Sequence, residues 1–235
     1  AGGMNAPLDI SGLLNDDGSL QFGRMTFDDE VLYAYEVGLK SSFWDNRARL
    51  NLAGFYYDYN DYQAFDFQGL TTVVFNTDAR IYGLDAELTA SPLDGLDIML
   101  GATIMHAEAL DVPVGNRVID RDIVLAPTYN VTGMARYSWP AGGGMAAVQS
   151  DFKYMSSHYF NISNAPTTRQ GGYVVANARV SWATEDERWE IAGFVRNFTN
   201  KDYSQIRFDV SGDGFTELFQ GNPRWWGASI TFRYN

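Results

Sequence analysis

The amino-acid sequence predicts an all-β fold, a transmembrane antiparallel up-and-down β-barrel. Three observations support this prediction: apolar and polar residues alternate, the alternating segments run for about eleven to sixteen residues, and the links between them are short and long in turn. Strands in soluble proteins average about 5 or 6 residues, whereas a tilted strand needs about 9 to 11 residues to cross the hydrocarbon layer. Short turns at one end and long loops at the other are typical of outer-membrane barrels.

Nine strands follow from the period-2 alternation of apolar and polar residues. We expect them at residues 30–43, 47–60, 78–91, 96–109, 126–138, 145–160, 172–183, 189–199 and 224–235. Tight, turn-rich links are expected at 44–46, 92–95, 140–144 and 185–188, and long polar links at 61–77, 110–125, 161–171 and 200–223. Aromatic residues gather near the predicted strand ends, where membrane barrels carry aromatic girdles: Phe43, Trp44, Tyr137, Trp139, Trp182 and Trp189.

Each predicted strand has an apolar face and a polar face. In residues 79–90, Tyr82 and Leu84 lie opposite Asp85 and Glu87. In a barrel the apolar face meets lipid and the polar face lines the lumen. Nine charged residues are therefore predicted to face the lumen: Glu36, Lys40, Arg49, Asp85, Glu87, Asp151, Lys153, Arg179 and Arg196. The same alternation also fits a soluble β-sandwich, in which the apolar face forms the core.

Composition excludes several classes of protein. The 235 residues carry a net charge of −12 and no block of Lys or Arg, which argues against nucleic acid as a partner. No apolar run reaches the roughly 18 residues that a transmembrane helix requires. The sequence contains no cysteine, so disulfides and cysteine-ligated zinc are excluded.

Four stretches resemble the barrels of TonB-dependent receptors from Gram-negative outer membranes. "YAYEVGLKSSFWDNRARLNLAGFYYDYNDYQ" at 33–63 resembles a hairpin in which a Tyr-Glu-x-Gly-x-Lys strand turns into an Arg-Leu strand that ends in Phe-Tyr-x-x-Tyr. "ARIYGLDAELTASP" at 79–92 resembles the strand that follows it. "VRNFTNKDY" at 195–203 resembles the motif that ends the penultimate strand, and "WGASITFRYN" resembles the terminal strand.

The resemblance implies that residues 1–235 form the C-terminal part of such a barrel. "AGGMNAP" at the start resembles the top of one more upward strand, which gives ten strands against about 22 in a complete receptor. The plug domain, the N-terminal strands and the short segment that TonB binds are therefore expected outside this sequence. Asn235 is expected on the periplasmic side of an outer membrane.

The function implied by the resemblance is uptake of a scarce, bulky nutrient, usually a ferric siderophore, through the plugged barrel. The implied partners are outer-membrane lipid, the receptor's own plug and remaining strands, TonB and a small-molecule ligand. The charged lumen residues would face the plug. No enzyme activity and no cofactor are implied.

Two alternatives remain open from the residues themselves. One is a self-contained ten-stranded outer-membrane barrel, either structural or with an enzyme site at its rim. For a rim enzyme the candidates are His106 and His158 with a carboxylate such as Asp111, although these histidines equally fit titrating surface residues. The other alternative is a soluble carbohydrate-binding β-sandwich.

Two further sites are suggested by loop composition. Tyr62, Phe65 and Phe67 in the link 61–77 could line a ligand vestibule at the external rim, or pack against neighbouring loops. In the link 200–223, the residues Asp209, Ser211 and Asp213 stand at alternate positions before a glycine, which resembles the first half of a calcium loop. The Glu that closes such a loop is replaced by Gln, so a solvated turn is the competing interpretation.

Overall fold

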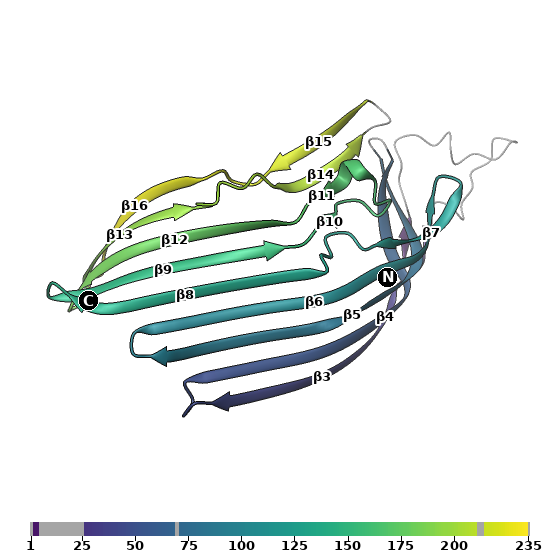
Figure 1. Cartoon of the computed structure of the whole chain (residues 1–235). Coiled ribbons are helices and arrows are strands. Elements are labelled where there is room, and N and C mark those ends of the chain that lie inside the picture. Colours follow the sequence, from purple (N-terminus) through teal and green to yellow (C-terminus); the bar gives the residue numbers. More distant parts are fainter. Residues whose placement is uncertain (1, 5–25, 69–70, 211–213, 235) are drawn as a thin grey trace, which may run out of the picture.

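The computed structural model describes residues 2–4, 26–68, 71–210 and 214–234, and most of them lie in one curved antiparallel sheet (Figure 1). Its nine long strands are β3 (Val31–Phe43), β4 (Ala48–Gln68), β5 (Thr71–Leu93), β6 (Leu96–Val114), β8 (Tyr129–Ala141), β9 (Gly144–Met155), β12 (Tyr173–Thr184), β13 (Trp189–Arg196) and β16 (Trp225–Phe232). They pair in the order β16-β13-β12-β9-β8-β6-β5-β4-β3, and β7 (Arg117–Asp122) pairs with β6. Each long strand pairs with the next long strand of the chain, which confirms the predicted up-and-down topology.

The remaining elements are short and do not join the hydrogen-bonded ladder of the main sheet. Three two-stranded sheets pair β1 (Gly3–Met4) with β2 (Thr26–Phe27), β10 (His158–Tyr159) with β11 (Arg169–Gln170), and β14 (Ser204–Val210) with β15 (Phe215–Gln220). One turn of 3₁₀ helix, η2, spans Pro166–Thr168. No helix in the described ranges has the length and the apolar character needed to cross a membrane.

The β-sandwich alternative is wrong, because no second sheet of comparable size covers the nine strands in the described part of the chain. Within the same residues, β3 and β16 form the two edges of the main sheet and do not pair with each other. The sheet is therefore an open section of barrel wall. A self-contained ten-stranded barrel would require closure of the first strand onto the last, which these strands do not show.

The short links and the long links lie at opposite ends of the sheet, which we call the turn end and the loop end (Figure 1). At the turn end, the β3–β4 connection places Trp44, Asp45 and Asn46 at positive φ angles of 58°, 51° and 65°. Asn and Asp tolerate this left-handed conformation better than most residues, which suits the sequence to a tight turn.

Three of the predicted long links are wrong as loops, because strands continue through them. Residues 61–77 mostly extend the β4–β5 hairpin, β6 and β7 form a second hairpin within 110–125, and β14 and β15 form a third within 200–223. The register shifts between Tyr59 and Tyr62 in β4. Such a bulge interrupts the period-2 pattern, so the continuation of the strand cannot be recognised from alternation alone.

The register defines two faces of the main sheet, since residues paired across an antiparallel ladder point the same way. We call the face of Leu84, which pairs with Gly54 and Ile104, the outer face. We call the face of Glu87, which pairs with Asn51 and Gly101, the inner face. Large apolar side chains stand exposed on the outer face, as shown by the exposed fractions of Val37 (76%), Leu84 (62%) and Ile230 (70%).

The hydrophobic core lies at the loop end. Its buried members are Ala64, Ala79, Ala107, Ala109, Val112, Ile123 and Ile162. Ala79 and Ala109 are register partners on the inner face, and their small side chains leave room for the loop between β10 and η2. Ile162 of that loop is only 1% exposed. Burying its side chain contributes about 1.5–3 kcal/mol, which holds the loop against the inner face.

Polar contacts fasten the same loop to β7. The side chain of Asn164 accepts a hydrogen bond from the backbone N–H of Asp122 (2.8 Å) and donates one to its carbonyl oxygen (3.0 Å). The hydroxyl of Thr168, which is fully buried, donates to the carbonyl oxygen of Ala165 (2.9 Å). The loop therefore has a defined position over the inner face.

Candidate functional site

The register places all nine charged residues predicted for the lumen on the inner face: Glu36, Lys40, Arg49, Asp85, Glu87, Asp151, Lys153, Arg179 and Arg196. Two of the carboxylates already accept hydrogen bonds from amides on the same face. Asn51 Nδ2 donates to Glu87 Oε2 (3.3 Å), and Asn177 Nδ2 donates to Asp151 Oδ2 (2.6 Å). The inner face is therefore a polar surface with partly paired charges.

An ion-pair cluster lies on the inner face near the turn end. Arg179 and Arg233 both contact the carboxylate of Glu190, the second through Nη2 and Oε2 at 3.1 Å. Arg233 also donates to the carbonyl oxygen of Glu187 (3.0 Å). The sequence identified Arg179 as a lumen residue but not its partners, because the register that brings β12, β13 and the end of β16 together is not visible in the sequence.

A cavity of about 880 Å³ lies between the inner face and the loops at the loop end. Its floor comes from the strands and includes Glu87, Met99, Thr132, Met134, Asp151, Lys153, Val175 and Asn177. Its roof comes from the segment that begins with β10 and from the start of β14 with the residue before it, and includes His158, Phe160, Tyr203, Ser204 and Gln205. The volume is within the range of small-molecule sites, and the walls combine apolar area with a few polar groups.

Tyr203 is held in the roof by packing from two directions. Its ring stacks on that of Tyr173, with centroids 4.7 Å apart and planes inclined by 16°. Gly221 lies against the same ring, since an added Cβ would stand 2.0 Å from Cζ of Tyr203. Gly221 also donates its backbone N–H to the carbonyl oxygen of Tyr203 (2.8 Å). A side chain at position 221 would displace the ring, so this glycine is required for the close approach.

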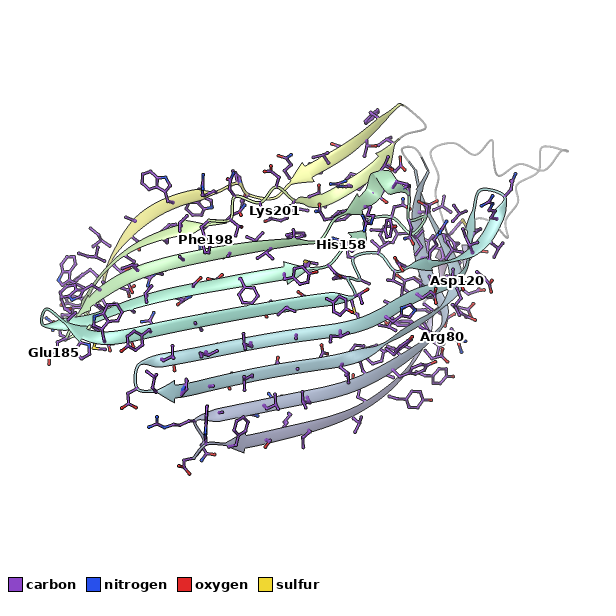
Figure 2. The ribbon with its side chains drawn as sticks, viewed as in Figure 1. Arg80, Asp120, His158, Glu185, Phe198 and Lys201 are labelled. Atoms are coloured by element: carbon purple, nitrogen blue, oxygen red, sulfur yellow. The ribbon has the colours of Figure 1, made fainter. Side chains whose placement is uncertain are left out.

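His158 is buried in the roof at 4% exposure, which corrects its interpretation as a titrating surface residue (Figure 2). Its Nδ1 lies 3.1 Å from the carbonyl oxygen of Ser156, so Nδ1 carries the proton and donates. Burial lowers the pKa of His158; the hydrogen bond to Ser156 opposes this, and the positive charges of Lys153 and Arg207 reinforce it. His158 is therefore a neutral member of the cavity wall near neutral pH.

The loops of the roof are joined by a buried amide. Gln170 is 5% exposed, and its Oε1 accepts a hydrogen bond from the backbone N–H of Ser204 (2.8 Å). Arg207 Nε donates to the hydroxyl of Ser204 (2.9 Å). Thr167 donates to Asp209 at 2.8 Å across the same boundary. These contacts tie the β14–β15 hairpin to β11 and make the roof one unit.

Asn197 anchors the start of the second roof segment. It is 3% exposed with a positive φ of 49°. Its Nδ2 donates to the carbonyl oxygens of Lys201 and Asn222 (both 3.0 Å), and its Oδ1 accepts from the backbone N–H of Lys201 (2.9 Å). Its own N–H donates to Asn177 Oδ1 (2.9 Å). The motif at 195–203 thus ends β13 at Arg196, three residues earlier than predicted, and directs the chain toward Tyr203.

A second cavity, of about 730 Å³, lies on the inner face toward β3. Glu36, Lys40 and Asp85 line it together with Asn130, whose Oδ1 is buried without a hydrogen-bond partner in the described residues. Buried acceptors of this kind are normally paired, so Asn130 is available to a group that enters from the lumen side.

The predicted vestibule residues lie in the extended β4–β5 hairpin, and neither Tyr62 nor Phe65 lines either cavity. Tyr62 packs beside the core, with its ring 5.6 Å from that of Tyr59. Phe65 is 39% exposed and stands on the other side of the strand from Tyr62. The backbone of Phe67 pairs with Thr72. A role for these residues in ligand contact stays a prediction.

The structure does not bring the two histidines together. His106 lies on the outer face of β6, where its ring is 5.2 Å from that of Tyr82 and its Nε2 is 3.5 Å from Glu108. His158 lines the cavity on the inner side. Asp111 is not grouped with either histidine. Its backbone N–H donates a hydrogen bond to the side-chain Oδ1 of Asp120 (3.0 Å). The arrangement proposed for a rim enzyme is therefore not formed.

The calcium prediction falls mostly outside the described residues. Asp209 accepts a hydrogen bond from Thr167, whereas Ser211 and Asp213 lie in the range 211–213, which the structure does not describe. Among the described residues, no three His, Asp or Glu side chains are grouped closely enough to hold a metal ion.

Comparisons with known proteins agree with this geometry. The family model described as TonB dependent receptor-like, beta-barrel, matches residues 2–198. The chain is similar to the ferric yersiniabactin uptake receptor FyuA from Yersinia pestis, with 19% identity and a TM-score of 0.74, over 89% of this chain and 31% of that one. It is also similar to BauA, the ferric preacinetobactin receptor from Acinetobacter baumannii, with 18% identity and a TM-score of 0.68, over 97% and 32%.

A third similar structure is the copper transporter OprC, with 15% identity and a TM-score of 0.65, over 89% of this chain and 31% of that one. The chain thus spans about a third of the length of these proteins. At such low identity the structural likeness shows the fold. The family match over residues 2–198, together with the fold, shows that this chain belongs to the TonB-dependent receptor family, within its β-barrel.

Proposed function

We propose that this chain forms the C-terminal part of the barrel wall of an outer-membrane transporter that takes up a ferric siderophore or a similar bulky chelate. The observation that carries the proposal is one antiparallel sheet with two unlike faces, an exposed apolar outer face and a charged inner face beneath a roofed cavity. Hydrocarbon suits the first face and a polar lumen suits the second.

In this proposal the nine charged residues of the inner face line the lumen, and those outside the 880 Å³ cavity contact the plug: Glu36, Lys40, Arg49, Asp85, Arg179 and Arg196. Polar and ionic contacts with a plug can be exchanged for water, whereas a large apolar interface would resist separation. The edges β3 and β16 pair with the other strands of the receptor, because unpaired backbone groups in lipid cost several kcal/mol each. TonB binds a segment that lies outside these residues.

We place the turn end in the periplasm and the loop end outside the cell. This orientation is supported by the short turns and the C-terminus, which lie together at the turn end, and by the tall hairpins at the other (Figure 1). Bacterial barrels have short periplasmic turns and longer extracellular loops. The cavity then lies on the external side, where a ligand would arrive.

The choice of an iron chelate as cargo is supported by the similar receptors FyuA and BauA, whose descriptions name ferric ligands. The size of the cavity, about 880 Å³, is compatible with a bulky small molecule.

Uptake of radioactive iron(III) by cells that carry the complete receptor tests the proposal. We expect accumulation from at least one ferric siderophore in cells with TonB, and loss of accumulation in cells without TonB or after dissipation of the proton gradient. Equal accumulation with and without TonB, or no accumulation from any ferric complex, would contradict the proposed function.

A further inference from the structure

We propose that the inner-face cavity admits metal chelates of zero or positive net charge and discriminates against polyanionic chelates. This inference rests on the proposed function, because it names the charge class of the cargo. Its support comes from the charges that line the cavity and the charges of the hairpins that lead to it.

The cavity lining carries more negative than positive charge. Its charged members are Glu87, Asp151 and Lys153. Each carboxylate holds one amide hydrogen bond, which leaves other lone pairs free to accept from a ligand. His158 contributes no charge near neutral pH. A polyanion that enters the cavity would therefore meet a net negative charge.

Lys153 is the opposing charge and has a limited effect. It is the single Lys or Arg in the described lining, and it forms no ion pair within the described residues. One ammonium group can donate a hydrogen bond to a carbonyl oxygen of a neutral chelate. It cannot offset two carboxylates for a ligand with several negative charges.

Aromatic side chains add apolar contact to the cavity: Tyr173, Tyr203 and Phe160 line it. The ring of Tyr203 is covered by Tyr173 on one side and by Gly221 on another. These rings therefore offer apolar contact to a chelate, and the discrimination by charge rests on the carboxylates.

The hairpins at the loop end extend the negative potential beyond the cavity. Across residues 58–80 and 108–122 carboxylates outnumber guanidinium groups. The carboxylates are Asp58, Asp61, Asp66, Asp78, Glu108, Asp111, Asp120 and Asp122, and the guanidinium groups are Arg80, Arg117 and Arg121. Charges arranged in this way change the approach rate of a charged ligand by about tenfold or more at low salt. Beyond about 8 Å the effect is screened at physiological ionic strength.

Charged quenchers measure the cavity potential without any knowledge of the ligand. A single cysteine at Val175, in the lining, would carry a small fluorophore in the complete receptor, and caesium, acrylamide and iodide would be compared as quenchers. We expect the ratio of caesium to iodide quenching to exceed that of the free dye about threefold at low salt and to approach it at 1 M salt. A ratio at or below that of the free dye would overturn the proposal.

Two variants should shift the caesium-to-iodide quenching ratio in opposite directions, and a third serves as the control. Asp151→Asn should lower the caesium-to-iodide ratio, and Lys153→Gln should raise it. Glu185→Gln removes the same charge as a carboxylate variant but lies at the turn end, far from the cavity, and should leave the ratio unchanged (Figure 2). If the Asp151 and Lys153 variants shift the ratio in the same direction, misfolding rather than charge is responsible and the proposal fails.

A charge series on one chelate then tests the cargo itself. The iron(III) complexes of ferrioxamine B, its N-acetyl derivative and its N-succinyl derivative carry charges of about +1, 0 and −1 with the same iron-binding groups. We expect TonB-dependent uptake to fall in that order, by about tenfold across the series at low salt. Preference for the succinyl derivative would overturn this inference alone.

The two failures are distinguishable. Loss of TonB-dependent uptake for every ferric complex would remove the proposed function. The quencher ratio would still decide the charge of the cavity, even for a receptor that transports none of the three ferrioxamine derivatives.

Discussion

Asn197 shows how one buried side chain can direct a whole connection. Its amide binds the backbone of Lys201 and Asn222, and leucine at this position would remove these three hydrogen bonds. Each such hydrogen bond contributes about 0.5–1.5 kcal/mol to stability. We predict that Asn197→Leu lowers the free energy of unfolding in lipid by about 2 kcal/mol or more.

The matched control for that substitution is Asn200→Leu. Asn200 has nearly the same backbone angle, with φ of 50°, but its side chain is exposed. Both variants therefore share the strain of a leucine in the left-handed region, and only the first loses the hydrogen bonds. Equal losses of stability in a denaturant titration would show that backbone strain, and not the amide, accounts for the effect.

His158 predicts a pH dependence of the roof. Its folded pKa lies below the unfolded value of about 6.5, chiefly because it is buried. Stabilisation by the neutral side chain is therefore fully present above about pH 6.5 and is lost as the pH falls through the folded pKa. The protection factors of the amides of residues 158–170, which correct for the pH dependence of intrinsic exchange, should fall on acidification in the wild type more than in His158→Gln. An equal fall in both proteins would assign the effect to other groups.

At the scale of single residues, alternation alone groups the nine charged residues on one face of the sheet, and the register shows that they share it. Their contact with the lumen stays a prediction. It could not find Glu190 as the partner of Arg179, or Tyr173 as the partner of Tyr203, because these pairs join segments far apart in the chain. The burial of His158 could not be predicted, because no residue near it in the sequence indicates that the β14–β15 hairpin is hydrogen-bonded to β11 beside it.

At the scale of strands, the outer and inner faces make opposite demands on a side chain. Leu84→Arg places a charge on the outer face, at a position that is 62% exposed. Near the middle of the hydrocarbon this costs about 2–4 kcal/mol. Glu87→Gln stays polar on the inner face and should cost far less. Folding titrations of both variants in lipid would measure the order, and a larger loss for Glu87→Gln would reverse the assignment of the faces.

Strands could be predicted where apolar and polar residues alternate strictly. The prediction failed where a bulge interrupts the alternation. The sequence placed β3, β12 and β16 within a few residues at their start, because apolar and polar positions alternate through them without interruption. It missed the extensions of β4 and β5, because the register shifts after Tyr59 and interrupts the alternation. From the amino-acid sequence alone, hairpins of this kind cannot be distinguished from polar loops.

At the scale of the whole molecule, the main sheet is an open section of barrel wall and not a closed domain. Large apolar side chains are exposed on the outer face, and the cluster of buried apolar side chains lies at the loop end. The topology could be predicted from strand length and from the order of turns and loops. The cavity could not, since its floor and roof come from segments as distant as Glu87 and Tyr203.

The most direct test of the account is a nitroxide scan along β5 in the complete receptor in lipid. Because these 235 residues contain no cysteine, single cysteines can be introduced at positions 84 to 88 as the labels of this segment. The account predicts period-2 alternation: labels at Leu84, Ala86 and Leu88 are relaxed by oxygen in the lipid, and labels at Asp85 and Glu87 by a water-soluble nickel reagent. Equal access of the nickel reagent to all five positions would contradict a membrane barrel wall.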